Sequence, residues 1–221
     1  MALRIYLPAS GAAGLAALAF DAGWNKTSQA TRLKGVLAKI DTALTTRSML
    51  SSAATPELHC CVQYQLAGLA AQSLSGTVKG QTRANVNNVL FAGTIAIGIR
   101  VVSAAGVVRG TALAVSASDS ASTPPRLNTA LTNRPFMDVS ENAALALTPV
   151  ACQTGDVLVI ELGSRDVDTG TARSCFLSVG DPIAAADLPE DSTTTTALCP
   201  WIEFSANLVF GLPRSMYGAM M

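Results

Sequence analysis

The sequence predicts an all-β protein: an antiparallel β-sandwich of the jelly-roll type with about eight strands and an extended N-terminal arm. Three observations support this fold class. Apolar side chains alternate with polar or small ones along several short segments, which is the period of a half-buried strand. Turn-forming residues separate these segments at intervals too short for parallel crossovers. At 221 residues, the chain is also long enough to bury the core of one such sandwich.

The chain begins with a short alternating segment, residues 3–8, which ends at a proline and is expected to form a strand or an extended arm. Because free termini normally fray, an ordered arm must be docked on a surface. The segment near residues 29–44 has apolar residues at helical intervals and favours one short helix. The Thr, Ser and β-branched residues of 41–55 fit an edge strand and loop equally well.

The clearest alternation lies between Leu58 and Val115. In its first strand the even positions from 60 to 66 are apolar, whereas Cys61, Gln63 and Gln65 fall on the opposite face. Short connections predict that this region is an antiparallel meander. Its four expected strands cover residues 60–66, 74–80, 95–103 and 107–115.

The second half opens with a loop, residues 116–142, that is rich in Ser, Asp, Thr, Pro and Asn. Residues 157–162 are apolar on both faces as far as Glu161, which predicts a central strand covered on each side. The remaining expected strands cover residues 145–150, 175–179 and 201–204. We therefore divide the chain into an N-terminal arm and docking segment (1–55), a jelly-roll sandwich (56–210) and a C-terminal tail (211–221).

The composition indicates a surface that is partly covered by neighbours. Hydrophobic residues make up 49% of the chain, charged residues only 14%, and the formal net charge is zero. An alanine-rich sequence would give the same numbers without any such role. The basic residues are dispersed, which argues against binding to nucleic acid. No window holds the eighteen or more apolar residues of a membrane span.

The five cysteines form neither a disulfide framework nor a zinc motif. They are odd in number and lack C-x-x-C spacing, so we expect reduced thiols, mostly in the core. We expect no cofactor and no metal. A calcium site in the loop Asp187–Asp191 is the alternative, because clustered oxygen ligands suit that ion.

Catalytic motifs are scarce. His59 is the single histidine, and its strand neighbour Cys60 should point to the opposite face. Paired carboxylates of the kind that glycosidases need are present, but they lie in loops where acids commonly stabilise turns. We expect a protein that is not an enzyme, with a glycan-cleaving enzyme as the remote alternative. The carboxylate candidates are Asp166, Asp168, Asp187, Glu190 and Asp191.

Five segments together resemble a class of virion structural proteins of tailed bacteriophages. They are Arg4–Gly11, Phe20–Trp24, Leu74–Gly80, Leu188–Asp191 and Pro200–Ser205. The resemblance extends over most of the chain, and its motifs are structural rather than chemical. It implies a jelly-roll subunit that coats or decorates a particle, either on the capsid or in association with the tail, and it implies no catalytic residues.

The expected function follows from the composition and this resemblance: a multi-copy virion component held by contacts with identical subunits and other virion proteins. Burial of an apolar arm would contribute several kcal/mol at about 25 cal/mol per Å². The alternative is a carbohydrate-binding module that recognises a host-surface glycan. The residues expected at the subunit interface are Leu3, Ile5, Tyr6, Leu7 and Trp24.

Overall fold

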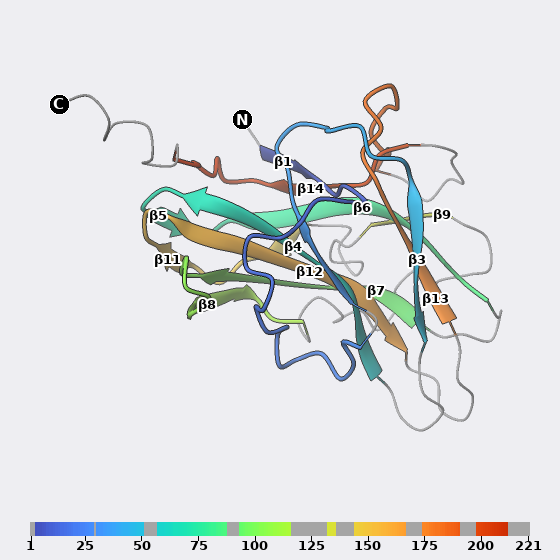
Figure 1. The fold of residues 1–221 in the computed structure, drawn as a ribbon, viewed down its shortest axis with the longest axis horizontal. Helices are drawn as coiled ribbons and strands as arrows, with labels where there is room; N and C mark the ends of the chain where they lie inside the picture. The colour runs from blue at the N-terminus through green and yellow to red at the C-terminus, as the bar shows by residue number, and fades with distance from the viewer. Residues whose placement is uncertain are drawn as a thin grey trace.

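The computed structural model shows two β-sheets packed face to face, which confirms the predicted all-β sandwich (Figure 1). A third, two-stranded sheet lies at one end of the molecule. The chain passes repeatedly from one large sheet to the other, as in a jelly roll. The structure describes residues 3–28, 30–50, 57–87, 93–115, 132–135, 144–166, 174–190 and 198–211.

The first large sheet is built around β6, which pairs with different strands along its two edges. Its main path is β1-β14-β6-β13-β3, and β9 and β10 also pair with β6. All of these pairs are antiparallel. The strands are β1 (Leu3–Tyr6), β3 (Thr45–Leu50), β6 (Thr77–Val86), β9 (Thr132–Pro135), β10 (Leu145–Ala146), β13 (Ser174–Val179) and β14 (Trp201–Phe204).

The second large sheet has the order β2-β4-β12-β7-β8 and is centred on β12. Its strands are β2 (Thr31–Lys34), β4 (Glu57–Leu69), β7 (Gly93–Val102), β8 (Val108–Leu113) and β12 (Asp156–Asp166). The pair β2–β4 is parallel, and the other pairs are antiparallel. The small third sheet pairs β5 (Gln72–Leu74) with β11 (Val150–Cys152).

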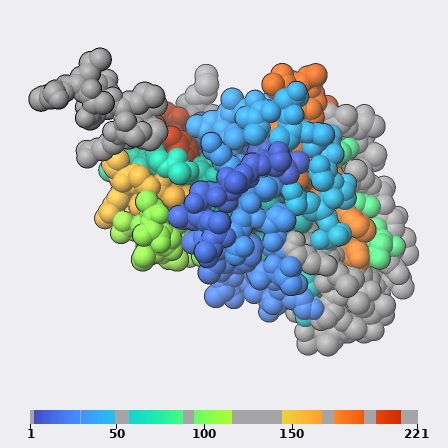
Figure 2. Space-filling view, viewed as in Figure 1, coloured from blue at the N-terminus to red at the C-terminus, as the bar shows by residue number. Residues whose placement is uncertain are grey.

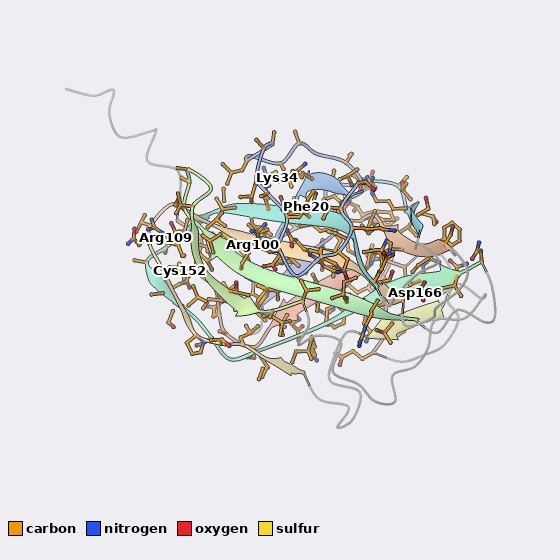
Figure 3. The ribbon with its side chains drawn as sticks, turned by 90° about the horizontal axis from the view of Figure 1, so that it is seen from below. Phe20, Lys34, Arg100, Arg109, Cys152 and Asp166 are labelled. Carbon is orange, nitrogen blue, oxygen red and sulfur yellow. The ribbon has the colours of Figure 1, made fainter. Side chains whose placement is uncertain are left out.

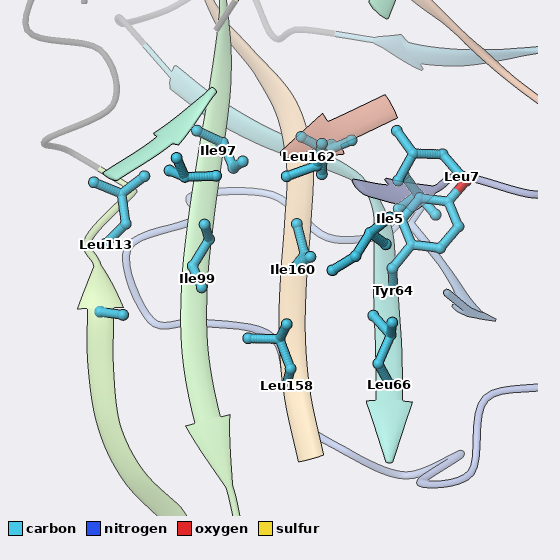
Figure 4. Close-up of a cluster of buried hydrophobic side chains, with 14 of the residues drawn as sticks. Ile5, Leu7, Tyr64, Leu66, Ile97, Ile99, Leu113, Leu158, Ile160 and Leu162 are labelled. Carbon is cyan, nitrogen blue, oxygen red and sulfur yellow. The ribbon is translucent and has the colours of Figure 1, made fainter. Parts of the chain in front are cut away.

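The main core fills the space between the two large sheets. On β12 the inward side chains are Leu158, Ile160 and Leu162, and Ile160 lies opposite Tyr64 on β4 and Ile99 on β7 (Figure 4). All three β12 side chains are fully buried. The outer face of β12 is also buried, as the sequence predicts for a central strand.

The predicted meander between Leu58 and Val115 is wrong in topology. β4 and β6 lie in opposite sheets, although β7 and β8 do pair as neighbours. The expected strand 74–80 is interrupted by Gly76, whose φ of 89° turns the chain between β5 and β6. Period-two alternation identifies strands locally, but it does not select the partner of each strand.

The expected short helix near residues 29–44 is also wrong. Residues 31–34 form β2, and the described residues that follow are extended or irregular as far as β3. Tertiary pairing with β4 overrides the helical spacing here, because it places Leu33 opposite the buried Tyr64. The boundary expected after residue 55 does not separate an arm from the sandwich, since β1, β2 and β3 belong to the large sheets.

A β-bulge interrupts the long β4–β12 ladder. Leu162 pairs with Val62 and Gly163 pairs with Cys60, so Cys61 is the extra residue on β4. Both Cys61 and Val62 consequently reach the main core, while Cys60 belongs to a smaller cluster on the outer side with Trp24. The bulge therefore reverses which residues of β4 face the core on either side of Cys61.

Candidate interaction surface

The arm expected at a subunit interface is docked on the sandwich of its own chain. β1 pairs antiparallel with β14, and Ile5 and Leu7 have 0% of their surface exposed. Leu3 and Tyr6 are half-buried. Ile5 and Leu7 are therefore core residues, and assigning them to a contact with another subunit was wrong.

Trp24 is likewise an internal anchor, with 6% of its surface exposed. Its indole Nε1 donates a hydrogen bond of 2.8 Å to the carboxylate of Glu161 on β12. The other tryptophan, Trp201, is only 1% exposed, as the sequence led us to expect of a core residue. A carbohydrate platform needs an exposed aromatic face, and neither indole offers one. Trp24 therefore supports neither the expected interface nor the alternative glycan site.

Glu161 is the centre of a buried polar network on the outer face of the second large sheet. Its carboxylate accepts hydrogen bonds from Arg100 at 2.9 Å, from Gln63 at 2.7 Å and from the backbone N–H of Asp21 at 3.0 Å. Glu161 is 1% exposed and Arg100 is 6% exposed. A buried carboxylate that accepts this many hydrogen bonds stabilises the fold.

This network holds residues 12–24, which we call the strap, across the outer face of the sheet. Arg100 also donates to the carbonyl of Ala19, and Gln65 exchanges two hydrogen bonds with the backbone of Leu15. Arg32 donates to the carbonyl of Leu18, and its guanidinium stacks over Phe20 at 4.2 Å. Figure 3 shows Phe20 and Arg100 close together on this side of the sandwich.

The loop carboxylates considered for glycoside cleavage or calcium binding are engaged in ion pairs. Asp187 contacts Arg4 at 2.7 Å and Lys39 at 2.9 Å, and Glu190 contacts Lys79 at 2.7 Å. Burial alone would raise the pKa of Asp187, but hydrogen bonds from Lys39 and Arg4 lower it below its ordinary value. These pairs attach the loop after β13 to β1 and β6, so the acids act as structural clamps. Asp168 and Asp191 lie outside the described residues.

His59 on β4 pairs with Ser164 on β12, two residues before Asp166, which Figure 3 shows near one end of the sandwich. His59 is 4% exposed, and its Nε2 lies 2.9 Å from a carboxylate oxygen of Glu57, which also contacts Lys26 at 3.1 Å. Burial lowers the pKa of His59, and Glu57 partly opposes that shift. Cys60 belongs to the outer cluster instead, so His59 and Cys60 do not form a nucleophile–base pair.

The five cysteines are all free and buried. Burial raises the pKa of Cys61 and of Cys175 to about 12, so both thiols stay protonated near neutral pH. Among the described residues, no group of three or more His, Cys, Asp or Glu side chains has a geometry that would hold a metal ion.

Three exposed aliphatic side chains project from two loops that lie against each other. Leu37 is 44% exposed, Ile40 is 50% exposed and Ile183 is 62% exposed. We call these three residues the aliphatic knob. The backbone N–H of Ile40 donates to Asp181, and that of Ile183 donates to Asp41, so the two loops are hydrogen-bonded together. Figures 1 and 2 show the two loops adjacent at the top of the molecule, in light blue and orange.

The loops beneath the knob are rigidly supported. Asp181 is 0% exposed, and its carboxylate accepts hydrogen bonds from the backbone of Ile40 and from both the backbone and the hydroxyl of Thr42. Asp41 adopts a φ of 66°, a conformation that non-glycine residues seldom occupy. Strained backbone of this kind is concentrated at functional sites. The knob is therefore a preorganised apolar surface, which is favourable for binding.

A groove runs beside the strap. One part, of about 420 Å³, lies between the strap and the outer face of the sheet, and its walls include Leu15, Lys34, Ala67 and Val157. A second part, of about 500 Å³, shares Gly14 and Leu15 with the first and extends to the turn Ala104–Gly106. We call both parts together the strap groove. Figure 2 shows the strap, in dark blue, crossing the surface beside the green segment that contains this turn.

The sequence contains a signal for the knob, but its spacing favours a helix rather than an exposed loop. Leu37 and Ile40 contributed to the helical spacing, and Ile183 lies among turn residues without alternation. Large aliphatic residues in loop-forming sequence are the signal that could have identified an exposed apolar surface. The strap groove has no comparable sequence signal, because most of the residues that line it are Ala and Gly, which occur in any kind of structure.

Comparisons with known proteins leave the family open. No protein-family model matches the chain, and no curated protein matches it. Among solved structures, it is similar to a CocE/NonD family hydrolase from Staphylococcus aureus, with 9% identity and a TM-score of 0.28, over 92% of this chain and 34% of the hydrolase. It is also similar to a chain of infectious bursal disease virus, strain Gx, with 12% identity and a TM-score of 0.21, over 76% of this chain and 42% of the viral chain. The chain thus spans less than half the length of either structure. In the described part of the chain, no helix has the length and apolar character required to cross a membrane.

Proposed function

We propose that this chain is a non-enzymatic structural subunit that works in many copies by binding other copies of itself, as a component of a tailed-phage virion. The observation that carries the proposal is the aliphatic knob: Leu37, Ile40 and Ile183 are held exposed on loops fixed by the buried Asp181. A surface of this kind on a chain with only 14% charged residues and no net charge favours association over dispersal.

The energetics suit a repeated assembly. Complete burial of a Leu or Ile side chain contributes about 1.5–3 kcal/mol. The three knob residues are already partly buried, so one contact gives a modest gain that must also offset the entropy lost on association. Repetition of the same contact across many copies multiplies this gain through effective concentration.

The placement of the chemically active side chains supports a structural role. Asp187 and Glu190 are ion-paired in the loop clamp, Glu161 holds the strap, and His59 is buried beside Glu57. Each of these groups stabilises the fold through contacts within the chain. In the proposed role the partners are identical subunits and other virion proteins, the location is the virion, and neither nucleic acid nor membrane takes part.

The first test is the oligomeric state of the purified full chain, measured by sedimentation velocity over a range of concentrations. We expect concentration-dependent self-association, and we expect the double variant Ile40→Asp and Ile183→Asp to weaken it at least tenfold. The matched control is Val209→Asp, because Val209 is an equally exposed aliphatic residue, at 51%, outside the knob. A wild-type chain that stays monomeric at high micromolar concentration would refute the proposal.

The second test concerns the virion. Mass spectrometry of purified phage particles that carry this sequence should find the chain in many copies per particle, resistant to washing. Its recovery only in the soluble fraction of the lysate, with none in purified particles, would exclude a structural role in the virion. Self-association of a chain that is not found in the particles would mean that it forms a homo-oligomer outside the virion.

A further inference from the structure

We infer that copies of this chain associate head to tail, with the aliphatic knob of one copy seated in the strap groove of the next. This inference rests on the proposed self-association and specifies the two surfaces that meet. The occupant of the groove is thus a second copy of this chain.

The strap groove has the room and the lining that the knob requires. Its two parts measure about 420 and 500 Å³. Pockets of roughly 300–1,000 Å³ enclose a whole drug-sized ligand, so three aliphatic side chains fit within this space. The side chains of the walls are mainly Ala, Gly, Leu and Val, with Lys34 and Gln65 as polar exceptions, so the knob would meet mostly apolar side chains.

The charges at the two surfaces are complementary. Lys34 is exposed on the wall of the groove, and Asp41 is exposed beside Ile40 on the knob loop. Near the knob, Lys39 and Asp187 already pair with each other within the chain at 2.9 Å. Asp181 is buried and accepts hydrogen bonds from Ile40 and Thr42. A contact that brings Asp41 toward Lys34 adds orientation to an otherwise apolar fit.

Knob and groove belong to different surfaces, so the contact is heterologous. The β2–β3 loop and the loop after β13 form the knob, whereas the strap and the β7–β8 turn contribute to the groove. Each bound pair therefore leaves one knob and one groove free. Such contacts build rings when the rotation closes and filaments when it does not, and both are multi-copy structures.

The test uses two full-length variants, each with one damaged surface. Ile183→Asp damages the knob, and Ala104→Glu places a charge in the groove at an exposed turn position. We expect each variant alone to self-associate at least tenfold more weakly than wild type. Mixed in equal amounts, the variants should form a species of twice 22.7 kDa that does not grow further, because one intact knob still meets one intact groove.

The possible outcomes distinguish this inference from the proposed function. A monomeric wild type overturns both. If wild type associates and Ile183→Asp disrupts that association while Ala104→Glu does not, the groove is not the receiving surface and the inference fails. If both variants are disrupted but their mixture stays monomeric, the intact knob does not bind the intact groove, which also overturns the inference. Circular dichroism and urea midpoints close to those of wild type show that each variant is folded.

The ion pair offers an independent check on orientation. Lys34→Glu and Asp41→Lys should each weaken association by roughly three- to tenfold, because each brings like charges together. An equimolar mixture of these two variants should regain most of the normal association, because alternating copies pair Asp41 with Lys34 at one contact and the two introduced charges with each other at the next. The double variant that carries both changes should regain most of it, since every interface then holds a reversed pair. Failure of the double variant to recover would contradict the pairing of Asp41 with Lys34.

Discussion

Glu161 shows how a single buried carboxylate organises a large surface of this protein. It lies in the central, buried strand β12, and its carboxylate accepts hydrogen bonds from Arg100, Gln63, Trp24 and a backbone N–H of the strap. The donors come from three segments that are distant in sequence, namely the strap, β4 and β7, and all meet at one carboxylate. The ion pair between Glu161 and Arg100 is costly to break, because removing one charge leaves the other buried without a partner.

We therefore expect Glu161→Gln to lower the free energy of unfolding by about 3 kcal/mol, since Arg100 would stay charged and buried without its partner. Urea denaturation monitored by circular dichroism measures the change. The control is Glu190→Gln, which removes an exposed ion pair with Lys79 and should cost less than about 1 kcal/mol. Equal losses in the two variants would show that the strap network is not stabilising.

His59 gives a second prediction, on pH. Burial lowers its pKa below the ordinary 6.5, so the unfolded chain binds this proton more readily than the folded chain. The contribution of His59 to stability is complete above pH 6.5 and is lost as the pH falls toward the pKa of the folded state. We expect His59→Gln to flatten the decline in stability just below pH 6.5, measured as urea midpoints at successive pH values. An unchanged slope would mean that Glu57 compensates the buried imidazolium fully.

Among the strands, the β4–β12 pair determines most of the architecture. β12 lies between β4 and β7 and is buried on both faces, and the bulge at Gly163 changes which residues of β4 face the core. On the N-terminal side of the bulge, Cys61 and His59 face the core side of the sheet, where simple alternation would place Cys60 and Leu58. The backbone of β4 approaches β12 closely at this point.

Gly163 is required for that approach. A Cβ atom at this position would lie 1.8 Å from the carbonyl oxygen of His59 and 2.8 Å from the ring of Trp24. We expect Gly163→Ala to destabilise the protein by about 3 kcal/mol or more, because a backbone atom cannot move aside easily. Gly14→Ala is the matched control, since nothing lies within 4 Å of its added Cβ, and it should change stability by less than about 1 kcal/mol. Thermal unfolding of both variants measures the two changes in stability. A Gly163→Ala variant as stable as wild type would show that the backbone at the bulge can shift to accept a Cβ atom.

At the scale of the whole molecule, this protein combines a rigid sandwich with a surface of low charge. The N-terminal segment, which the sequence suggested for docking on a neighbour, completes both large sheets and covers one of them. Three exposed aliphatic residues, Leu37, Ile40 and Ile183, lie instead on loops that are held by hydrogen bonds to Asp181 and Asp41. A subunit of this design can associate without prior unfolding or exchange of its arm.

An association dominated by apolar burial should respond weakly to salt. With a net charge of zero there is little long-range repulsion or attraction to screen. We expect the dissociation constant for self-association to change less than about threefold between 0.05 and 0.5 M NaCl, whereas ammonium sulfate should tighten it. Sedimentation equilibrium gives both numbers. A steep weakening with NaCl would indicate that ion pairs, rather than the knob, hold the copies together.

The sequence by itself determined which segments are strands and that the fold is an all-β sandwich. Alternation and continuous apolar runs are local properties, so β4, β7, β8, β12, β13 and β14 could be located from them. The burial of Trp201 and of the cysteines also followed from residue type.

Only the tertiary structure decided which strands share a sheet, where the arm docks and which apolar residues stay exposed. Strand pairing depends on contacts between segments far apart in the chain, so β4 and β6 could be assigned to opposite sheets only in three dimensions. The same holds for Ile5, Leu7 and Trp24, whose burial requires β14 and Glu161 as partners. An apolar residue in sequence shows only a tendency to be covered, and the packing of the whole chain decides whether its own core or another molecule provides the cover.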